Sequence, residues 1–482
     1  MDGIVFEFIS KVAKYFLKRT LNYSTFGIFM NLIILKTTIK INRFLFLLSI
    51  LFCLVIKGYS QDGFSLPKNI DKDNIKFKLI NNLVVIPIEV NGTTLTFLLD
   101  TGVSSTIMFS LSEVDSLQLN NTETIKLRGL GKGGSISALK SKDNILKIGE
   151  AADYHHTVFV IFDKSLNLST RMGIPIHGIV GYEFFKNLIV KTNYKLKKIT
   201  FSKPDTYKPK KCKKCEVFNL TFKNKKAYLK MYASTSKNSD KKEEVFLLLD
   251  SGSSDAIWLF DDTEFVKDPL FKSFDDFLGE GLSGSIFGKR SKLSSLEIGS
   301  FKFKNVKVAF PDKASLENIK MFDERNGSIG GDLLKRFTII LDYPNRKISL
   351  KKNSSFKAPF HYNMSGLTLK HDGVILVKDK KKPINKLKSN SDGAVNINVK
   401  TIYNFYLAPR FIVSEIRKDS PADLAGIETG DEIITVNGKL THSYELQDII
   451  GLFASKAGKK ISLKIKRRGV IFKKKFILKE VL

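Results

Sequence analysis

An apolar run that ends in an aspartate and a tight turn occurs twice in this chain. Residues 97–102 read Phe-Leu-Leu-Asp-Thr-Gly, and residues 246–252 read Phe-Leu-Leu-Leu-Asp-Ser-Gly. Each run predicts a buried strand that carries its aspartate, Asp100 or Asp250, into the turn. A carboxylate is costly to bury in such a place unless it is hydrogen-bonded or shares a proton. Two such sites therefore predict that the carboxylates meet, cannot both ionise and titrate as a pair.

These motifs are part of a duplication that relates residues 75–201 to residues 216–350. Several landmarks keep one register across the two copies, which chance does not readily produce. The matched landmarks are Asp100 and Asp250, Gly129 and Gly279, and Ile148 and Ile298, 150 residues apart, and the segments 179–186 and 328–335, and 193–199 and 342–348, 149 apart. Both copies read as short β-branched and aromatic runs between turn residues. The sequence therefore predicts a mainly β protein with two similar lobes of the closed-barrel or sandwich type.

The order of motifs within each copy resembles one lobe of an aspartic protease. That order is a strand ending in Asp-Thr/Ser-Gly, a Gly-rich hairpin, and a second apolar strand that ends in Gly before a short helix. Two lobes in one chain resemble the pepsin-like enzymes, and short lobes with a Gly-rich hairpin in each are similar to the retropepsin-like branch. The resemblance covers residues 75–350 and implies a peptide hydrolase that needs no cofactor.

The resemblance also implies a role for each matching residue. Asp100 and Asp250 would form the catalytic dyad. The residues that would support the dyad are Thr101 and Ser251, through hydrogen bonds across it, and Gly102 and Gly252, through a backbone turn that offers N–H groups. The flaps expected to close over an extended peptide would contain Gly129, Gly131, Gly133, Gly134, Gly279, Gly281 and Gly284. Neither flap carries the Tyr that is typical of pepsin-like enzymes, which favours the retropepsin-like branch.

The C-terminal part of the chain resembles a PDZ domain of the kind appended to bacterial proteases. The resemblance rests on residues 411–416 (FIVSEI), 420–427 (SPADLAGI) and 430–438 (GDEIITVNG). PDZ domains bind an extended peptide, often a C-terminus, by adding it as a strand to an exposed sheet edge. By position, the groove would consist of Phe411, Ile412, Val413 and Ser414, lined by a helix over 444–453. Residues 366–369 could supply an earlier strand, which would make the Lys/Asn-rich stretch near 376–405 an insertion within the domain.

The N-terminus has the pattern of a secretory signal. An uncharged apolar run over 44–56 follows Lys36, Lys40 and Arg43 and is itself followed by small residues up to Ser60. The run is shorter than the roughly 20 residues that span a bilayer. We therefore expect export to the periplasm or the medium after cleavage near Ser60, with retention as a membrane anchor as the alternative. Translation could start at Met1 or at Met30.

The expected organisation has four parts. They are an N-terminal extension with the signal (1–60), lobe 1 (61–203), lobe 2 (204–353) and the PDZ domain (354–482). Net charge is +31, but Lys is spread through every segment without an Arg-rich or aromatic-interleaved patch, so we expect no nucleic-acid partner.

The cysteines and histidines do not form a metal pattern. Cys212 and Cys215 form a lone C-x-x-C without a second pair or a nearby His, which favours a local disulfide over a zinc site. His155, His156 and His177 have no ligand partners at metal spacing and are expected in solvent or in turns. Trp258 is expected in the core of lobe 2.

Two functions follow from these patterns. The first is an exported aspartic endopeptidase that acts on proteins or peptides, with a PDZ domain that binds peptide or regulates access. The alternative is a catalytically inactive envelope adaptor that binds peptide with the same lobes and PDZ domain. Loss of cleavage in dyad variants separates the two.

Overall fold

The computed structural model describes residues 62–109, 116–127, 136–162, 168–209, 211–235, 242–260, 272–281, 284–316, 324–380, 384–389, 395–400 and 403–482. Of the N-terminal segment it describes residues 10–11, 14, 27–28, 30–32 and 34–44, all of them helical. By its contacts the chain divides into two units, Met1–Gln61 and Asp62–Leu482.

The described residues of the first unit cover only part of the predicted signal peptide. No helix in the described part of the chain is long and apolar enough to cross a membrane. Apart from Phe44, the apolar run 44–56 and the position near Ser60 lie outside the described residues. The signal peptide and its cleavage stay predictions.

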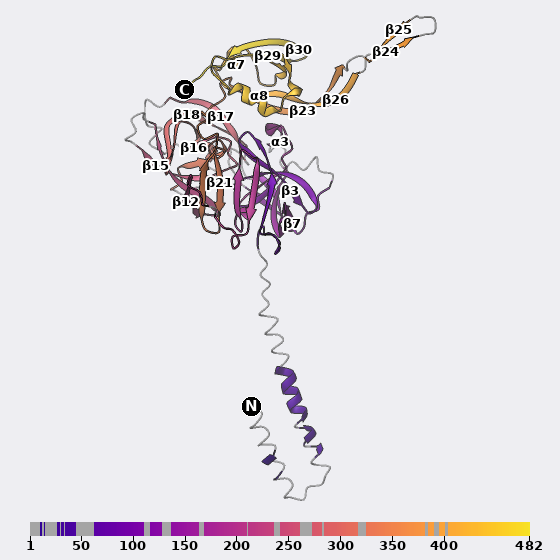
Figure 1. Ribbon diagram of the computed structural model, residues 1–482, viewed down its shortest axis with the longest axis vertical. Helices are drawn as coiled ribbons and strands as arrows, with labels where there is room; N and C mark the ends of the chain where they lie inside the picture. The colour runs from indigo at the N-terminus through magenta and orange to yellow at the C-terminus, as the bar shows by residue number, and fades with distance from the viewer. Residues whose placement is uncertain are drawn as a thin grey trace. The chain divides into compact units, whose positions relative to one another are not determined.

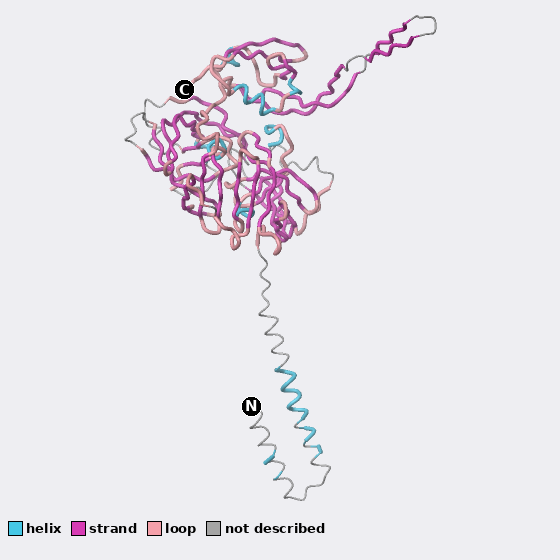
Figure 2. The backbone as a smooth tube through the Cα atoms, viewed as in Figure 1, coloured by secondary structure: helices cyan, strands magenta, loops and turns pink. Residues whose placement is uncertain are grey.

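Each lobe of the second unit is an eight-stranded sheet, and strands dominate both lobes (Figure 2). The lobe 1 strands are β2 (Lys78–Ile80), β3 (Leu83–Val90), β4 (Thr93–Leu99), β5 (Thr106–Met108), β6 (Thr122–Leu127), β7 (Ile136–Ile148), β8 (Ala151–Ile161) and β9 (Gly178–Val180). The lobe 2 strands are β13 (Thr221–Lys223), β14 (Lys226–Ser234), β15 (Glu243–Leu249), β16 (Ile257–Leu259), β17 (Phe274–Gly281), β18 (Gly284–Ile298), β19 (Phe301–Pro311) and β20 (Gly327–Ile329).

The two lobes share one topology. Their strand orders are β2-β3-β4-β9-β5-β8-β7-β6 and β13-β14-β15-β20-β16-β19-β18-β17. An additional pairing, β3 with β7 and β14 with β18, folds each sheet back on itself. The orders correspond position by position, so the mainly β fold with two similar lobes is confirmed.

A six-stranded sheet joins the lobes and takes three strands from each copy. Its order is β1-β11-β10-β21-β22-β12. The strands are β1 (Lys72–Lys76), β10 (Ile189–Asn193), β11 (Lys198–Ser202), β12 (Cys215–Asn219), β21 (Phe337–Asp342) and β22 (Lys347–Lys352). The seam is the antiparallel pair β10–β21, in which Lys191 lies opposite Ile340. One hydrophobic core runs through this sheet and both lobes, which fixes the two lobes against each other.

Short helices and a disulfide complete the lobes. Helices α4 (Tyr182–Phe185) and α6 (Gly331–Leu334) follow the matched strands β9 and β20, and α3 (Leu168–Met172) and α5 (Lys313–Leu316) lie in the preceding connections. Cys212 and Cys215 are joined in a disulfide at the start of β12.

The C-terminal domain has a second core and a sheet of order β23-β26-β27-β29-β30, to which β28 adds at β27. Its elements are β23 (Leu367–Lys380), β26 (Tyr403–Ile416), α7 (Pro421–Leu424), β27 (Glu432–Val436), β28 (Lys439–Leu440), α8 (Leu446–Phe453), β29 (Lys460–Arg467) and β30 (Val470–Ile477). The Lys/Asn-rich insertion forms the far end of a long β ribbon, with β24 (Ile384–Ser389) and β25 (Val395–Lys400) beyond β23 and β26 (Figure 1).

The predicted peptide groove at residues 411–414 is wrong. These residues belong to β26, which pairs with β23 on one side and with β27 on the other. Phe411 and Val413 point into the domain core, and Val413 N–H donates to Asp431 O at 2.9 Å. The edge strand on this side of the sheet is instead β23, the earlier strand that residues 366–369 were considered to supply.

Candidate active site

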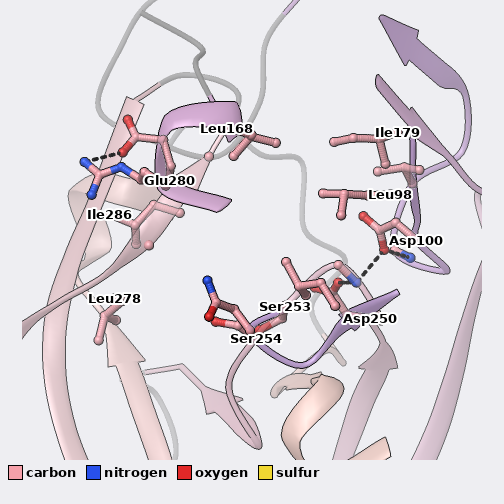
Figure 3. A pocket seen from close by; sticks show the side chains of 18 of the residues that line it. Leu98, Asp100, Leu168, Ile179, Asp250, Ser253, Ser254, Leu278, Glu280 and Ile286 are labelled. Atoms are coloured by element: carbon pink, nitrogen blue, oxygen red, sulfur yellow. Dashed lines mark hydrogen bonds and ion pairs between the residues drawn. The ribbon is translucent and has the colours of Figure 1, made fainter. Parts of the chain in front are cut away.

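Asp100 and Asp250 lie at the ends of β4 and β15, where the duplicated topology brings the lobes together (Figure 3). The backbone N–H of Asp100 donates to Val180 O at 2.8 Å, and that of Asp250 donates to Ile329 O at 3.0 Å. Each aspartate is thus held by the apolar strand that runs parallel to its own, β9 or β20.

A symmetrical set of hydrogen bonds locks the two turns together. The Thr101 hydroxyl donates to Leu249 O at 2.7 Å, and the Ser251 hydroxyl donates to Leu99 O at 2.9 Å. In addition, the backbone N–H of Thr101 donates to Ser251 Oγ at 3.0 Å, and the N–H of Ser251 donates to Thr101 Oγ1 at 3.1 Å. The two hydroxyls therefore bridge the lobes.

The glycines that follow allow the carboxylates to approach. Gly102 N–H donates to Asp100 Oδ1 at 2.7 Å. Gly252 N–H lies 3.0 Å from Asp100 Oδ1 and 3.1 Å from Asp250 Oδ1, so one donor reaches both side chains. A Cβ at Gly252 would overlap the Asp100 carboxylate. The sequence at these positions is dictated by the closeness of the two acids.

The environment keeps a proton on this pair near neutral pH. Burial, followed by the charge of Asp250, raises the pKa of Asp100 to about 7, against the lowering effect of the Gly102 and Gly252 N–H groups. Burial also raises the pKa of Asp250, but the charges of Arg325 and Lys226 oppose the rise. The cations next to Asp250 favour the ionised form of that residue, which leaves the proton on Asp100.

The dyad lies in the wall of a cavity of about 620 Å³ between the lobes. Lobe 1 contributes an aliphatic wall that includes Leu98, Leu168 and Ile179 (Figure 3). Lobe 2 contributes Ser253 and Ser254 beside the dyad and the β17–β18 hairpin. An apolar cavity with a few convergent polar groups is the usual form of a ligand site.

The described residues of the predicted lobe 2 flap belong to strands β17 and β18, which contribute to the cavity lining. Gly281 lies opposite Gly284, and Gly279 lies opposite Ile286 after a shift in strand register. Glu280, near the hairpin tip, forms an ion pair with Arg171 of α3 at 3.0 Å. The Arg171 guanidinium carbon also lies 4.4 Å from the centre of the Phe277 ring. The predicted lobe 1 flap residues, Gly129, Gly131, Gly133 and Gly134, lie outside the described residues.

Three cavity residues were not predicted. Trp258 is half-buried: it packs against the lobe 2 cluster of Leu278, Ile286 and Ala309, as expected of a core residue. It also lines the cavity and donates from Nε1 to Asp255 Oδ2 at 2.9 Å. Lys226 and Arg325 also line the cavity. No motif marks these positions, because their place in the cavity depends on strand register and on a loop before β20.

His156 differs from its predicted solvent or turn position. It is buried in β8, with Nδ1 2.7 Å from Asp153 Oδ2 and Nε2 2.7 Å from Thr106 Oγ1. Both ring nitrogens are therefore satisfied within lobe 1. Among the described residues there is no group of three or more His, Cys, Asp or Glu side chains that could hold a metal ion.

The PDZ domain contributes to the same cavity. Thr368 and Leu369 of β23 and Ile450 of α8 line it together with the dyad. A Cβ placed at Gly173, directly after α3, would lie 2.9 Å from Leu446 Cβ, so α8 touches lobe 1.

Contacts with lobe 2 anchor the domain on its other side. Arg417, with a side chain that is 7% exposed, lies 4.6 Å above the Phe274 ring and 3.9 Å from Asp276 Oδ1. Lys292 Nζ lies 2.6 Å from Glu480 Oε1. The PDZ domain therefore touches both lobes, and its edge strand β23 lies against α3 and lines the cavity through Thr368 and Leu369.

Two family models match parts of this chain. Residues 86–184 match the family model for aspartyl proteases, and residues 412–467 match a PDZ domain model. The carboxy-terminal processing protease CtpA of Bacillus subtilis is 44% identical over 59 residues, which are 12% of this chain and 12% of that protein. The aspartic proteinase from Irpex lacteus, among solved structures, is 13% identical, with a TM-score of 0.40 over 60% of this chain and 99% of that chain. The chain thus combines an aspartyl protease domain with a C-terminal PDZ domain, in the expected order.

Proposed function

We propose that this protein is an exported aspartic-type endopeptidase and that Asp100 and Asp250 are its catalytic residues. The observation that carries the proposal is the shared donor: Gly252 N–H reaches a carboxylate oxygen of each aspartate. Two acids held this close share one proton, which supplies a general base and a general acid at the same site.

The charges around the dyad suggest how the roles divide. Asp250, next to Lys226 and Arg325, takes a proton from a water molecule whose oxygen attacks the peptide carbonyl. Asp100 gives its proton to the carbonyl oxygen, which forms a neutral tetrahedral diol. When the diol collapses, the C–N bond breaks and Asp250 gives its proton to the leaving nitrogen. Asp100 takes a proton back from a diol hydroxyl, which restores the dyad, and the acid product keeps the water oxygen. No covalent intermediate is needed.

We further propose that the PDZ domain controls access to the cleft. An extended peptide that adds to β23 would pass Thr368 and Ile450, which line the same cavity as the dyad. The Ile450→Lys variant would place a charge in this path and should reduce cleavage of long substrates more than of short ones. Leu424→Lys, at a PDZ residue that is 77% exposed, is the matched control. Equal effects of both variants, or none, would refute this role.

The experiment that tests the function is cleavage of an unbiased peptide library from pH 3 to 8. The proteins are the full chain, the Asp100→Asn and Asp250→Asn variants, and an Asp205→Asn control at an exposed position. Cleavage by the parent and the control, but by neither dyad variant, supports the proposal. Cleavage that persists in a dyad variant rejects it, and peptide binding without any cleavage supports the adaptor alternative.

Export has its own test. N-terminal sequencing of the protein recovered from the medium or the periplasm should begin close to residue 61. A protein recovered only with membranes, with residues 44–56 still attached, would support the anchored alternative.

A further inference from the structure

The duplication provides an internal reference for each position in the cleft. Val85 of β3 lies opposite Leu98, and Tyr228 of β14 lies opposite Leu248. Leu98 and Leu248 each precede their aspartate by two residues, so Val85 and Tyr228 are equivalent. Two positions earlier on the same strands, lobe 1 carries Leu83 and lobe 2 carries Lys226.

At a second pair of equivalent positions, lobe 2 again carries a cation where lobe 1 carries an aliphatic residue. The backbone N–H of Thr96 donates to His177 Nδ1 at 3.1 Å, and that of Phe246 donates to Asn326 Oδ1 at 2.7 Å. Thr96 and Phe246 each precede their aspartate by four residues, which makes His177 and Asn326 equivalent. The residues directly before these two are Ile176, which is fully buried, and Arg325, which lines the cavity.

Lobe 2 therefore carries a cation at two positions where lobe 1 carries an aliphatic side chain. Arg325 is held in place because its Nε donates to Gly327 O at 3.1 Å and its guanidinium carbon lies 5.1 Å from the centre of the Phe260 ring. Burial lowers the pKa of Lys226, as does the charge of Arg325, whereas the two dyad carboxylates oppose that shift. Both cations are thus within electrostatic reach of Asp250.

Among the residues that the structure describes, the charges that line the cavity do not balance. Its described charged side chains are Asp100, Arg171, Lys226, Asp250, Glu280 and Arg325. Arg171 and Glu280 are paired with each other. The dyad carries one negative charge when it shares a proton. Neither Lys226 nor Arg325 has an ion pair with a described carboxylate, so one positive charge in a largely apolar cavity is left for a ligand.

We infer that the lobe 2 side of the cleft, at Lys226 and Arg325, is a subsite for a carboxylate of the bound peptide. The carboxylate is either an Asp or Glu side chain or the α-carboxylate at a peptide C-terminus. Guanidinium and ammonium groups make their strongest hydrogen bonds to carboxylates. The aliphatic wall of lobe 1 lines the same cavity, so the preferred peptide combines one acidic group with apolar neighbours. This inference deepens the proposed function and rests on it.

Paired peptides test the inference. From the library, one cleaved sequence with Glu at the enriched position is compared with its Gln twin, and one with a free C-terminus is compared with its amide. The full chain should prefer the acid of at least one pair by about tenfold or more in kcat/KM, mainly through KM. A Glu preference assigns the subsite to a side chain, and a preference for the free C-terminus assigns it to the terminal carboxylate.

Variants connect the preference to the two cations. Lys226→Leu introduces the residue found in lobe 1, and Arg325→Leu removes the second charge. Each should reduce the acid preference, and the double variant should abolish it. Lys230→Leu, at an exposed position of the same strand that is paired with Glu244, should leave it unchanged. If the cations act only on the Asp250 charge, the variants shift the kcat–pH profile and leave the acid preference intact, which overturns the inference.

A binding measurement keeps this test separate from the proposed function. Calorimetry with the Asp100→Asn variant, which is not expected to turn over, uses acetyl-Leu-Phe-Glu-Phe-Leu-amide, its Gln twin, and acetyl-Leu-Phe-Leu with a free or amidated C-terminus. Tighter binding of an acid form, lost in the Lys226→Leu/Arg325→Leu background, supports the subsite even if the parent cleaves nothing. If neither acid peptide binds more tightly than its neutral twin, the subsite is rejected even if the parent is an active protease.

Discussion

Thr101 and Ser251 each accept a backbone N–H from the other, at 3.1 and 3.0 Å, although they lie on different lobes. Each hydroxyl then donates to the carbonyl at the end of the opposite strand, Leu249 or Leu99. The two turns thus form one hydrogen-bonded unit. The separation of the two carboxylates is set by this unit and not by the carboxylates, which repel each other when both are ionised.

The Ser251→Ala variant tests the importance of this link. It removes a donor to Leu99 O and leaves the Thr101 N–H without its acceptor, so the free energy of unfolding should fall by about 1–3 kcal/mol. Cleavage should fall as well, because the dyad loses its alignment. Urea denaturation and peptide cleavage measure the two effects. Ser251→Thr keeps the hydroxyl and should retain most of both properties, and Ser273→Ala, at an exposed position, should change neither.

The shared proton predicts a dependence of stability on pH. The pKa of Asp100 is raised by burial to about 7, above the value of about 4 expected in the unfolded chain. Between these values the folded protein binds more protons than the unfolded one, so this group makes the protein less stable as pH rises from about 4 to about 7. The Asp100→Asn variant should lose that part of the dependence. Urea midpoints at pH 4, 5, 6 and 7 measure it, and identical pH profiles for parent and variant would contradict the assignment.

Cleavage should also depend on pH through this pair. Activity requires one proton on the dyad, so the rate should fall at high pH as Asp100 loses its proton, with a midpoint near 7, and at low pH as Asp250 gains one. A pH–rate profile on one library peptide measures both limbs. A rate that stays constant through pH 8 would contradict a shared proton in the active form.

Asp332 lies in helix α6, directly after β20. Its effect on the pH dependence of stability is opposite to that of Asp100. Burial favours its neutral form, but Lys307 at 3.2 Å and Lys335 at 2.8 Å lower its pKa to about 2. A lowered pKa stabilises the fold above about pH 4, and that stabilisation disappears as pH falls towards 2. Asp332→Asn should therefore cost about 2 kcal/mol or more at pH 7 and much less at pH 2. Urea denaturation at both values tests this, and an equal cost at both would contradict it.

The ion pair between Glu280 and Arg171 should restrain the lobe 2 hairpin. Glu280→Gln removes the charge and should speed hydrogen exchange in residues 274–281, because the hairpin then opens from α3 more often. Glu123→Gln, which removes a more exposed pair with Lys140, is the matched control and should leave this segment unchanged. Unchanged exchange in the Glu280 variant would show that packing, and not the ion pair, holds the hairpin.

Much of this architecture can be predicted from the sequence because the sequence contains a duplication. The spacing of 150 residues between Asp100 and Asp250 predicts equivalent lobes, and equivalent lobes predict that the aspartates meet on a pseudo-twofold axis. The hydroxyl and glycine positions follow from the same alignment. Local chemistry also predicts the disulfide of Cys212 and Cys215, because neighbouring cysteines of this spacing close without help from the rest of the fold.

The remaining features depend on contacts between distant segments. By their position in the PDZ pattern, residues 411–416 were expected at a sheet edge. An earlier strand, β23, which is separated from them in sequence by the inserted ribbon, takes that edge instead. His156 is hydrophilic in sequence, yet Asp153 and Thr106 satisfy it within lobe 1. In the sequence, nothing distinguishes Lys226 and Arg325 from surface cations. Only the folded structure shows that both line the cavity that contains the dyad.

The measurement that tests the central claim most directly is the initial rate of peptide cleavage by the purified full chain and by its Asp250→Asn variant. Both are assayed at pH 5 on the best library peptide, after circular dichroism has shown that both are folded. We predict that the variant is slower by about a thousandfold or more, because it loses the general base. A variant that cleaves within a few-fold of the parent would show that Asp250 is not catalytic and that this chain is not an aspartic protease.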